Sequence, residues 1–153
     1  MKLDDDIARL SRTRPFSLLP RDALQLIAFS AERRKLAVDE KLFEEGEAAD
    51  SGYFVLSGAI ALTASRHKGE WRRVAGVGAL IGEKAMIAEV LRSSSARAAE
   101  NSVVLRIPRS IFRRVLAEFP KEAAGIRASL AERTQKMSES LEELRARAIN
   151  PAQ

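Results

Sequence analysis

Hydrophobic and polar positions along the chain change their spacing twice, and this divides the sequence into three parts. In the first thirty residues, apolar side chains recur at helical intervals, which predicts amphipathic helices at residues 4–10 and 20–29. Pro20 suits the first turn of the second helix, because the N–H that proline lacks would have no partner there. We therefore expect residues 1–32 to form N-terminal helices.

From about residue 33 the pattern consists of short apolar runs separated by turn residues. The breaks fall at Gly46, at Ser51-Gly52 and at Ser57-Gly58. Regularly spaced short strands with such turn signals are typical of a sandwich, barrel or roll. We predict strands at residues 35–38, 41–44, 53–56, 59–63, 71–77 and 102–107.

Helical spacing returns after Pro108. A short helix is predicted over residues 110–119, and we expect it to end before Pro120. Residues 121–149 contain no proline and would form one helix about 40 Å long, at 1.5 Å per residue. An apolar stripe along this helix consists of Ile126, Leu130, Met137, Leu141, Leu144 and Ala148.

The three parts predict an α+β fold in a single domain over residues 1–153. Its centre is an antiparallel, jelly-roll-like β-roll over residues 33–107, flanked by the N-terminal helices 1–32. The C-terminal part, residues 108–149, adds a short helix and a long one. We see no internal repeat and no second domain.

Composition narrows the class of protein. The chain has 153 residues, enough for one domain with a real core, and its charged fraction of 31% is ordinary. It has no run of about 18 apolar residues, so no membrane segment is expected, and no secretory signal is visible.

Cysteine is absent, which excludes disulfides and thiolate metal sites. A cytoplasmic location is expected. The net charge of +5 is scattered and does not by itself indicate nucleic-acid binding.

The most concentrated chemistry lies in residues 80–98, which read LIGEKAMIAEVLRSSSARA. Gly82 and Glu83 begin a short helical stretch, whose free backbone N–H groups attract an anion. Arg92 follows nine residues after Glu83, and an arginine fork can grip phosphate oxygens. A nearby carboxylate can accept hydrogen bonds from sugar hydroxyls. These residues predict a pocket for a small phosphorylated ligand. The alternative is that Arg92 pairs with Glu89 or Glu83 in a plain structural salt bridge.

Two stretches resemble the cyclic nucleotide-binding domain, which occurs in catabolite activators, in regulatory subunits of cyclic AMP-dependent kinase and in cyclic nucleotide-gated channels. Residues 42–58, LFEEGEAADSGYFVLSG, are similar to the strand–turn–strand signature of that family. Residues 80–98 are similar to its phosphate-binding cassette, in which Gly-Glu and a short helix precede Arg-Ser/Thr-Ala. The resemblance extends from about residue 15 to residue 148, and the two motifs together are specific.

The resemblance implies a ligand, cAMP or cGMP, and a role for each cassette residue. Arg92 would pair with the cyclic phosphate, and Glu83 would bind the ribose 2′-hydroxyl. The backbone around Lys84 and Ala85, with the Ser93 hydroxyl, would complete the phosphate cradle. The ligand-binding set is Gly82, Glu83, Lys84, Ala85, Arg92, Ser93 and Ser94.

The resemblance also implies that the C-terminal helix closes over the base. A gapless alignment from Arg92 places Met137 and Ser138 where catabolite activators contact adenine. Ser138 could bond the base and Met137 could cover the ring, which favours cAMP over cGMP, although Met137 could equally pack in a core or a dimer. The stripe of the helix at 121–149 could form a homodimer seam or could pack on its own roll.

Other classes of function are weighed against this interpretation. An enzyme of the metal-dependent β-roll type needs several histidines and carboxylates, and the chain has one histidine, His67, in an expected loop. We therefore expect no catalytic activity, no metal and no cofactor other than the nucleotide ligand. Few residues follow the long helix, so direct DNA binding is not expected. The chain is either a stand-alone sensor or a fragment of a larger regulator, channel or enzyme, or else an interaction module that has lost its ligand.

Overall fold

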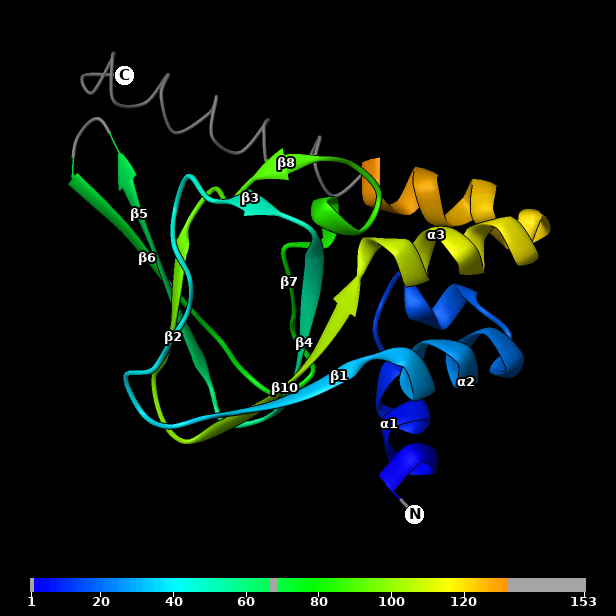
Figure 1. Ribbon diagram of the computed structural model, residues 1–153, viewed down its shortest axis with the longest axis horizontal. Helices are drawn as coiled ribbons and strands as arrows, with labels where there is room; N and C mark the ends of the chain where they lie inside the picture. Colours follow the sequence, from blue (N-terminus) through cyan, green and yellow to red (C-terminus); the bar gives the residue numbers. More distant parts are fainter. Residues whose placement is uncertain (1, 67–68, 132–153) are drawn as a thin grey trace, which may run out of the picture.

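The computed structural model describes residues 2–66 and 69–131 of the chain (Figure 1). The helices that lie wholly within these ranges are the α-helices α1 (Lys2–Leu10), α2 (Arg21–Ser30) and α3 (Arg109–Glu118) and the short 3₁₀ helices η1 (Phe16–Leu18) and η2 (Glu83–Met86). The strands are β1 (Glu32–Leu36), β2 (Lys41–Phe43), β3 (Ala48–Ala49), β4 (Ser51–Ser57), β5 (Ile60–Arg66), β6 (Gly69–Ala75), β7 (Leu80–Ile81), β8 (Val90–Leu91), β9 (Ser95–Ala98) and β10 (Ser102–Pro108). Residues 120–131 are also helical.

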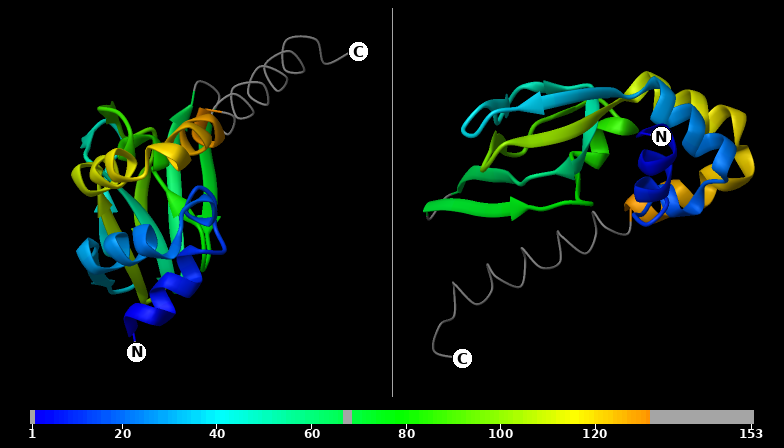
Figure 2. Two further views of the ribbon diagram at one scale, coloured as in Figure 1. Left: turned by 90° about the vertical axis from the view of Figure 1, so that its right-hand side faces the viewer. Right: turned by 90° about the horizontal axis from the view of Figure 1, so that it is seen from below.

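The strands form two antiparallel sheets and a small ribbon. One sheet has the order β1-β10-β4-β7, the other has the order β2-β9-β5-β6, and β3 pairs with β8. All the strand pairs are antiparallel. Figures 1 and 2 show the helices gathered at one end of the roll that these sheets make. The predicted α+β class, an antiparallel roll flanked by helices, is confirmed.

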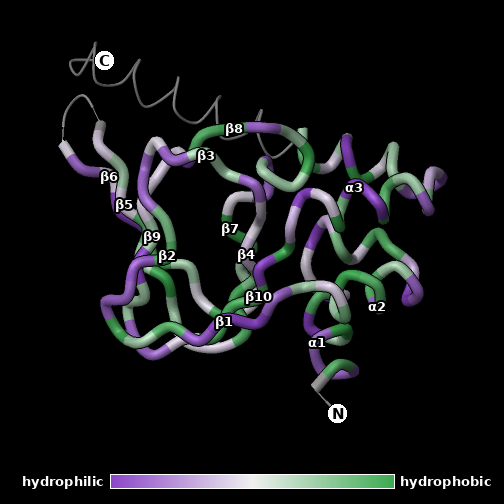
Figure 3. Tube along the Cα trace, in the orientation of Figure 1, coloured by the Kyte–Doolittle hydropathy of each residue, from purple (hydrophilic) through white to green (hydrophobic). Residues whose placement is uncertain are grey.

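Strand β4 is buried on both faces and separates two hydrophobic cores. Tyr53 and Val55 point into the interior of the roll, whereas Phe54 and Leu56 point toward the helices. This follows from the two-residue period of a strand, which sends alternate side chains to opposite faces. Strand β10 repeats the arrangement. Figure 3 shows hydrophobic residues concentrated in β4 and β10, while β6 at the sheet edge is largely hydrophilic.

The core on the helical side joins the N-terminal helices to α3 and to residues 123–130. The ring of Phe16 packs edge-on against those of Phe54 and Phe112, with centroids 6.3 Å apart in each pair. Ile126 and Leu130, the first residues of the predicted C-terminal stripe, are buried in this same core. The beginning of that stripe therefore packs on its own chain. The rest of the predicted helix at 121–149 lies outside the described residues.

The main differences from the predicted elements lie in the short strands. The pattern predicted no strand at β3, β7, β8 or β9, and three of these have only two residues. Strand β9 carries serine, alanine and arginine, so its inward face is marked only by the small residues Ala96 and Ala98. Short polar strands give too few alternating positions for the period to show.

Within the described ranges, no helix is both long enough and apolar enough to cross a membrane.

Candidate functional site

The 80–98 segment leaves strand β7 through a glycine in the left-handed conformation. Gly82 has φ +70° and precedes η2 as its N-cap residue. A Cβ atom at this position would lie 2.5 Å from Nη1 of Arg92. Glycine is therefore required both for the backbone angle, which costs other residues about 1–2 kcal/mol, and for the close approach of the guanidinium.

Arg92 is the most unusual side chain of the segment, because it is a buried cation. Only 7% of the residue is exposed. Its Cζ atom lies 4.2 Å from the ring centroid of Phe43 and 5.4 Å from that of Tyr53, so its charge is stabilised in part by cation–π contacts. Burial lowers the pKa of the guanidinium from its ordinary value, but an arginine stays protonated in proteins. The site therefore holds a permanent positive charge.

The guanidinium of Arg92 is incompletely bonded. Its Nη2 donates to the Ser51 hydroxyl at 3.5 Å, and Ser51 is itself completely buried. Its Nη1 has no hydrogen-bond acceptor within residues 2–66 and 69–131. An unsatisfied buried donor costs about 1–3 kcal/mol, so this nitrogen marks the place where an acceptor is missing.

No carboxylate of the described chain forms an ion pair with Arg92. The alternative of a structural salt bridge to Glu89 or Glu83 is therefore absent there. The nearest link to an acidic group is indirect, since the Ser51 hydroxyl donates to Asp50 at 3.0 Å. Asp50 also accepts a bond from Arg106 at 2.9 Å. Asp50 and Ser51 belong to the 42–58 motif, so the fold joins the two motifs at this point.

The backbone around Arg92 is fixed by the turn between β2 and β3. The Arg92 N–H donates to the Glu47 carbonyl at 2.7 Å, and the Gly46 N–H donates to the Arg92 carbonyl at 2.9 Å. The hydroxyl of Ser95 accepts a bond from the Glu45 N–H at 2.9 Å. Main-chain bonds to the neighbouring turn therefore hold the backbone of Arg92 in place.

A pocket of about 740 Å³ opens beside Arg92, within the usual size range of small-molecule sites. All seven residues of the predicted ligand-binding set line it. Lys84 and Ser93 are exposed, Glu83 and Ser94 are half-buried, and Ala85 is buried. The Ala85 N–H donates to the Gly82 carbonyl at 3.1 Å, so an incoming anion would have to share that amide.

The wall facing the cassette residues was not found from the sequence. Phe43 of β2, Leu62 of β5 and the pair Trp71 and Arg73 of β6 also line the pocket. The only sequence signal was that Trp71 and Arg73 are two residues apart on a predicted strand, which puts them on one face. Leu62 and Trp71 give the pocket an apolar surface, whereas the ring of Phe43 lies against Arg92 itself.

Three residues weighed from the sequence, Met137, Ser138 and His67, lie outside the described residues. Within the described chain, no three or more histidine, aspartate or glutamate side chains gather in a way that could hold a metal ion.

Comparison with known proteins gives the family. The family model for the cyclic nucleotide-binding domain matches residues 33–119, which is more than half of the chain and includes both motifs. The chain belongs to the cyclic nucleotide-binding domain family, and the resemblance in the sequence is confirmed.

Three similar proteins illustrate the range of the family. The lysophospholipase NTE1 of Pyricularia oryzae is 31% identical over 123 residues, which are 79% of this chain and 8% of that protein. The cyclic AMP receptor protein of Thermus thermophilus is 31% identical over 67% of this chain and 48% of its own length. A cyclic nucleotide-binding-like protein of Brucella abortus, of known structure, is 41% identical with a TM-score of 0.67, over 74% of this chain and 99% of that one.

The chain thus spans only a small part of the enzyme that it matches, and about half of the cyclic AMP receptor. The similar solved structures include the N-terminal domain of a transcriptional regulator and a catabolite activator. The similarity therefore shows a cyclic nucleotide-binding domain, and the activities of the longer proteins do not transfer with it.

Proposed function

We propose that this protein is a regulatory sensor module that binds a cyclic nucleotide and has no catalytic activity of its own. The observation that carries the proposal is the unsatisfied Nη1 of the buried Arg92, a residue that lines a pocket of suitable size. A cyclic phosphate diester supplies the charge and the acceptor oxygen that this nitrogen lacks. Its charge would also offset the cost of burying the guanidinium.

The remaining cassette residues are assigned to the other parts of the ligand. The Lys84 amide, the shared Ala85 amide and the hydroxyls of Ser93 and Ser94 would bond further phosphate oxygens, with Gly82 allowing the close approach. Glu83 would accept a hydrogen bond from the ribose 2′-hydroxyl. The purine would then lie toward Leu62 and Trp71, because these supply the apolar wall of the pocket.

We favour cAMP over cGMP as the ligand. The support is the alignment that places Ser138 at an adenine contact, together with the similarity to a cyclic AMP receptor protein. In this proposal the C-terminal helix closes over the bound base, with Met137 and Ser138 as its contacts. Closure can be driven only by the higher affinity of the ligand for the closed state.

Titration calorimetry of the folded, ligand-stripped protein with cAMP and with cGMP tests the proposal. We expect heat with both and tighter binding of cAMP. No heat with either nucleotide would refute the sensor function for these ligands, and tighter binding of cGMP would refute the base preference. The 2′-deoxy analogue of cAMP tests the ribose contact, because it should bind more weakly to the wild type but not to Glu83→Ala.

A second candidate function is that of a regulatory domain within a larger cyclic-nucleotide-regulated protein. The observation in its favour is that the matched relatives are longer, the chain spanning 8% of one and 48% of another. In either case we expect no direct DNA binding by this segment and a cytoplasmic location. A homodimer through the helix at 121–149 is a further expectation, and sedimentation with and without nucleotide would test it.

A further inference from the structure

Arg109, the first residue of α3, is bound to three carbonyl groups of the structure around the site. Its Nη1 lies 2.8 Å from the carbonyl oxygen of Ala88, 3.1 Å from that of Ala49 and 3.3 Å from that of Ala85. Its backbone N–H donates to the Asp50 carbonyl at 2.8 Å. One residue thus joins α3 to strand β3 and to the end of η2.

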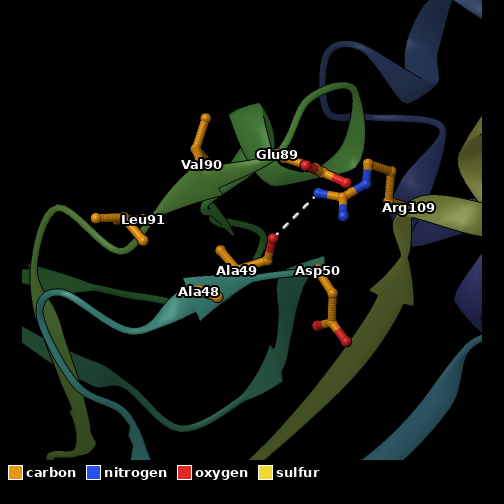
Figure 4. A pocket seen from close by; sticks show the side chains of 7 residues that line it. All are labelled: Ala48, Ala49, Asp50, Glu89, Val90, Leu91 and Arg109. Carbon is orange, nitrogen blue, oxygen red and sulfur yellow. Dashed lines mark hydrogen bonds between the residues drawn. The ribbon is translucent and has the colours of Figure 1, made fainter.

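The side chain of Arg109 lies in a second pocket, formed by the β3–β8 ribbon and the start of α3 (Figure 4). Figure 4 shows its guanidinium directed at the Ala49 carbonyl, while the side chain of Val90 points away from it. Ala49, Val90 and Leu91 line this pocket and also the pocket of Arg92. The ribbon is therefore a shared wall, and Arg109 holds it from the side that faces α3.

The positive charge of Arg109 is unfavourably placed for α3 and favourably placed for η2. The N-terminus of a helix carries a partial positive charge, and α3 has no acidic residue in its first turn. The last carbonyls of a helix are left without intrahelical donors and carry a partial negative charge. Ala85 supplies such a carbonyl in the last turn of η2, and the Ala88 carbonyl lies just after the helix ends. The charge of Arg109 therefore stabilises the contact between α3 and η2 rather than α3 itself.

Two of the three carbonyls that Arg109 holds belong to Ala49 and Ala85, which line the ligand pocket. Ala85 lines that pocket, and its N–H closes the turn onto Gly82. The neighbouring Met86 is completely buried and packs in the core that contains Phe112 of α3. A shift of η2 would therefore move the amide groups at the anion-binding end and would break the bonds to Arg109.

We propose that Arg109 is a positioning residue, which holds η2 in its ligand-binding geometry and fastens it to α3 without touching the ligand. The inference rests on the proposed function for its effect on nucleotide affinity, but the contact itself is present without ligand. A displacement of α3 would then be transmitted to η2 through the side chain of Arg109.

Hydrogen exchange of the ligand-free protein tests the positioning contact first. In Arg109→Gln, the amides of Ala85, Ile87 and Ala88 should exchange about tenfold faster, because charge-assisted bonds to their turn are lost. Amides of β10 serve as the internal reference for global stability. Arg109→Lys should restore most of the protection, since an ammonium group offers three donors to the same carbonyls. Arg113→Gln, an exposed change in the same helix, is the matched control.

Unchanged exchange at these three amides in Arg109→Gln would overturn the proposal, and so would equal acceleration at the β10 amides.

Calorimetry with cAMP is the second measurement. Affinity should fall about tenfold in Arg109→Gln, recover in Arg109→Lys and stay unchanged in Arg113→Gln. Wild-type affinity in Arg109→Gln would overturn the positioning role. If the wild type binds neither nucleotide, the proposed function fails, whereas the exchange measurement still decides whether Arg109 holds η2.

Discussion

Two arginines beside the β3–β8 ribbon differ in the hydrogen-bond acceptors that the fold offers to their guanidinium groups. Arg109 is half-buried, and its Nη1 has three carbonyl oxygens within bonding distance. Arg92 is almost completely buried, and its Nη1 has no acceptor in the described chain. The fold supplies three acceptors to Nη1 of Arg109, whereas within the described residues Arg92 bonds Ser51 through Nη2 and leaves Nη1 unsatisfied. A buried cation that the protein leaves unsatisfied is a better indication of a ligand site than the mere presence of an arginine in a pocket.

The largest effect is expected from Arg92→Met, which removes the charge but keeps much of the volume. Nucleotide affinity should fall by about 10- to 150-fold, or roughly 1.5–3 kcal/mol, because charge-assisted bonds to the phosphate are lost. The ligand-free protein should be more stable, by an amount on the order of 1 kcal/mol, because an unsatisfied buried donor disappears at the cost of a cation–π contact. Calorimetry and urea unfolding measure the two effects. Arg113→Met is the exposed control. A loss of stability in Arg92→Met would show that the fold satisfies Arg92 as it satisfies Arg109.

Gly82→Ala should have the next largest effect, because it attacks the same contact through the backbone. The left-handed φ should lower the free energy of unfolding by about 1–2 kcal/mol, and the new methyl group should displace Nη1 of Arg92 and weaken nucleotide binding. Gly78→Ala is a matched control, since Gly78 has φ +87° but open space around a Cβ. The control should lose similar stability and keep its affinity. Equal loss of affinity in both variants would show that strain alone, not the approach to Arg92, matters.

The smallest effect concerns Asp50, which reaches Arg92 only through Ser51. Burial acts to raise the pKa of Asp50, but hydrogen bonds from Ser51 and Arg106 and the charge of Arg106 outweigh it and hold the pKa below its ordinary value. A carboxylate with a depressed pKa contributes stability above its unfolded value, near 3.8, and loses it as the pH falls through the folded value. Because Asp50 is largely exposed, we expect less than about 1 kcal/mol.

Urea unfolding of the wild type and Asp50→Asn between pH 7 and pH 3 measures this contribution. The difference in unfolding free energy should be constant at neutral pH and should shrink below about pH 4. Adding Arg106→Met should abolish most of it, since the two side chains form one pair. A difference that persists at the lowest pH would show that the carboxylate charge is not its source.

Elements with a clear hydrophobic period could be predicted from the sequence. The helices of the first thirty residues, the strands at 53–56 and 102–107 and the short helix after Pro108 were all found within a few residues of their observed bounds. The two motifs identified the family and the residues that line one side of the pocket. What the pattern missed were two-residue strands and the polar strand β9, because too few apolar positions mark them.

The far wall and the supporting contacts of the site could not be read from local sequence. Trp71 lies more than twenty residues from Arg92, and Ser51 lies 41 residues away, yet all three meet at the site or its edge. Arg109 was not singled out at all, because an arginine at a helix start has no special local pattern. Its importance depends on the carbonyls that two other segments bring to it.

The sequence by itself determined the fold class, the family and the chemical identity of the cassette, because period, turn residues and motif spacing are local properties. The tertiary structure decided which donors are satisfied. Burial of Arg92 between Phe43 and Tyr53, with no carboxylate partner among the described residues, depends on contacts between segments far apart in the chain. So does the capture of Arg109 by three carbonyls. Such contacts are set by the packing of the whole roll, and so the difference between a binding arginine and a structural one appears only there.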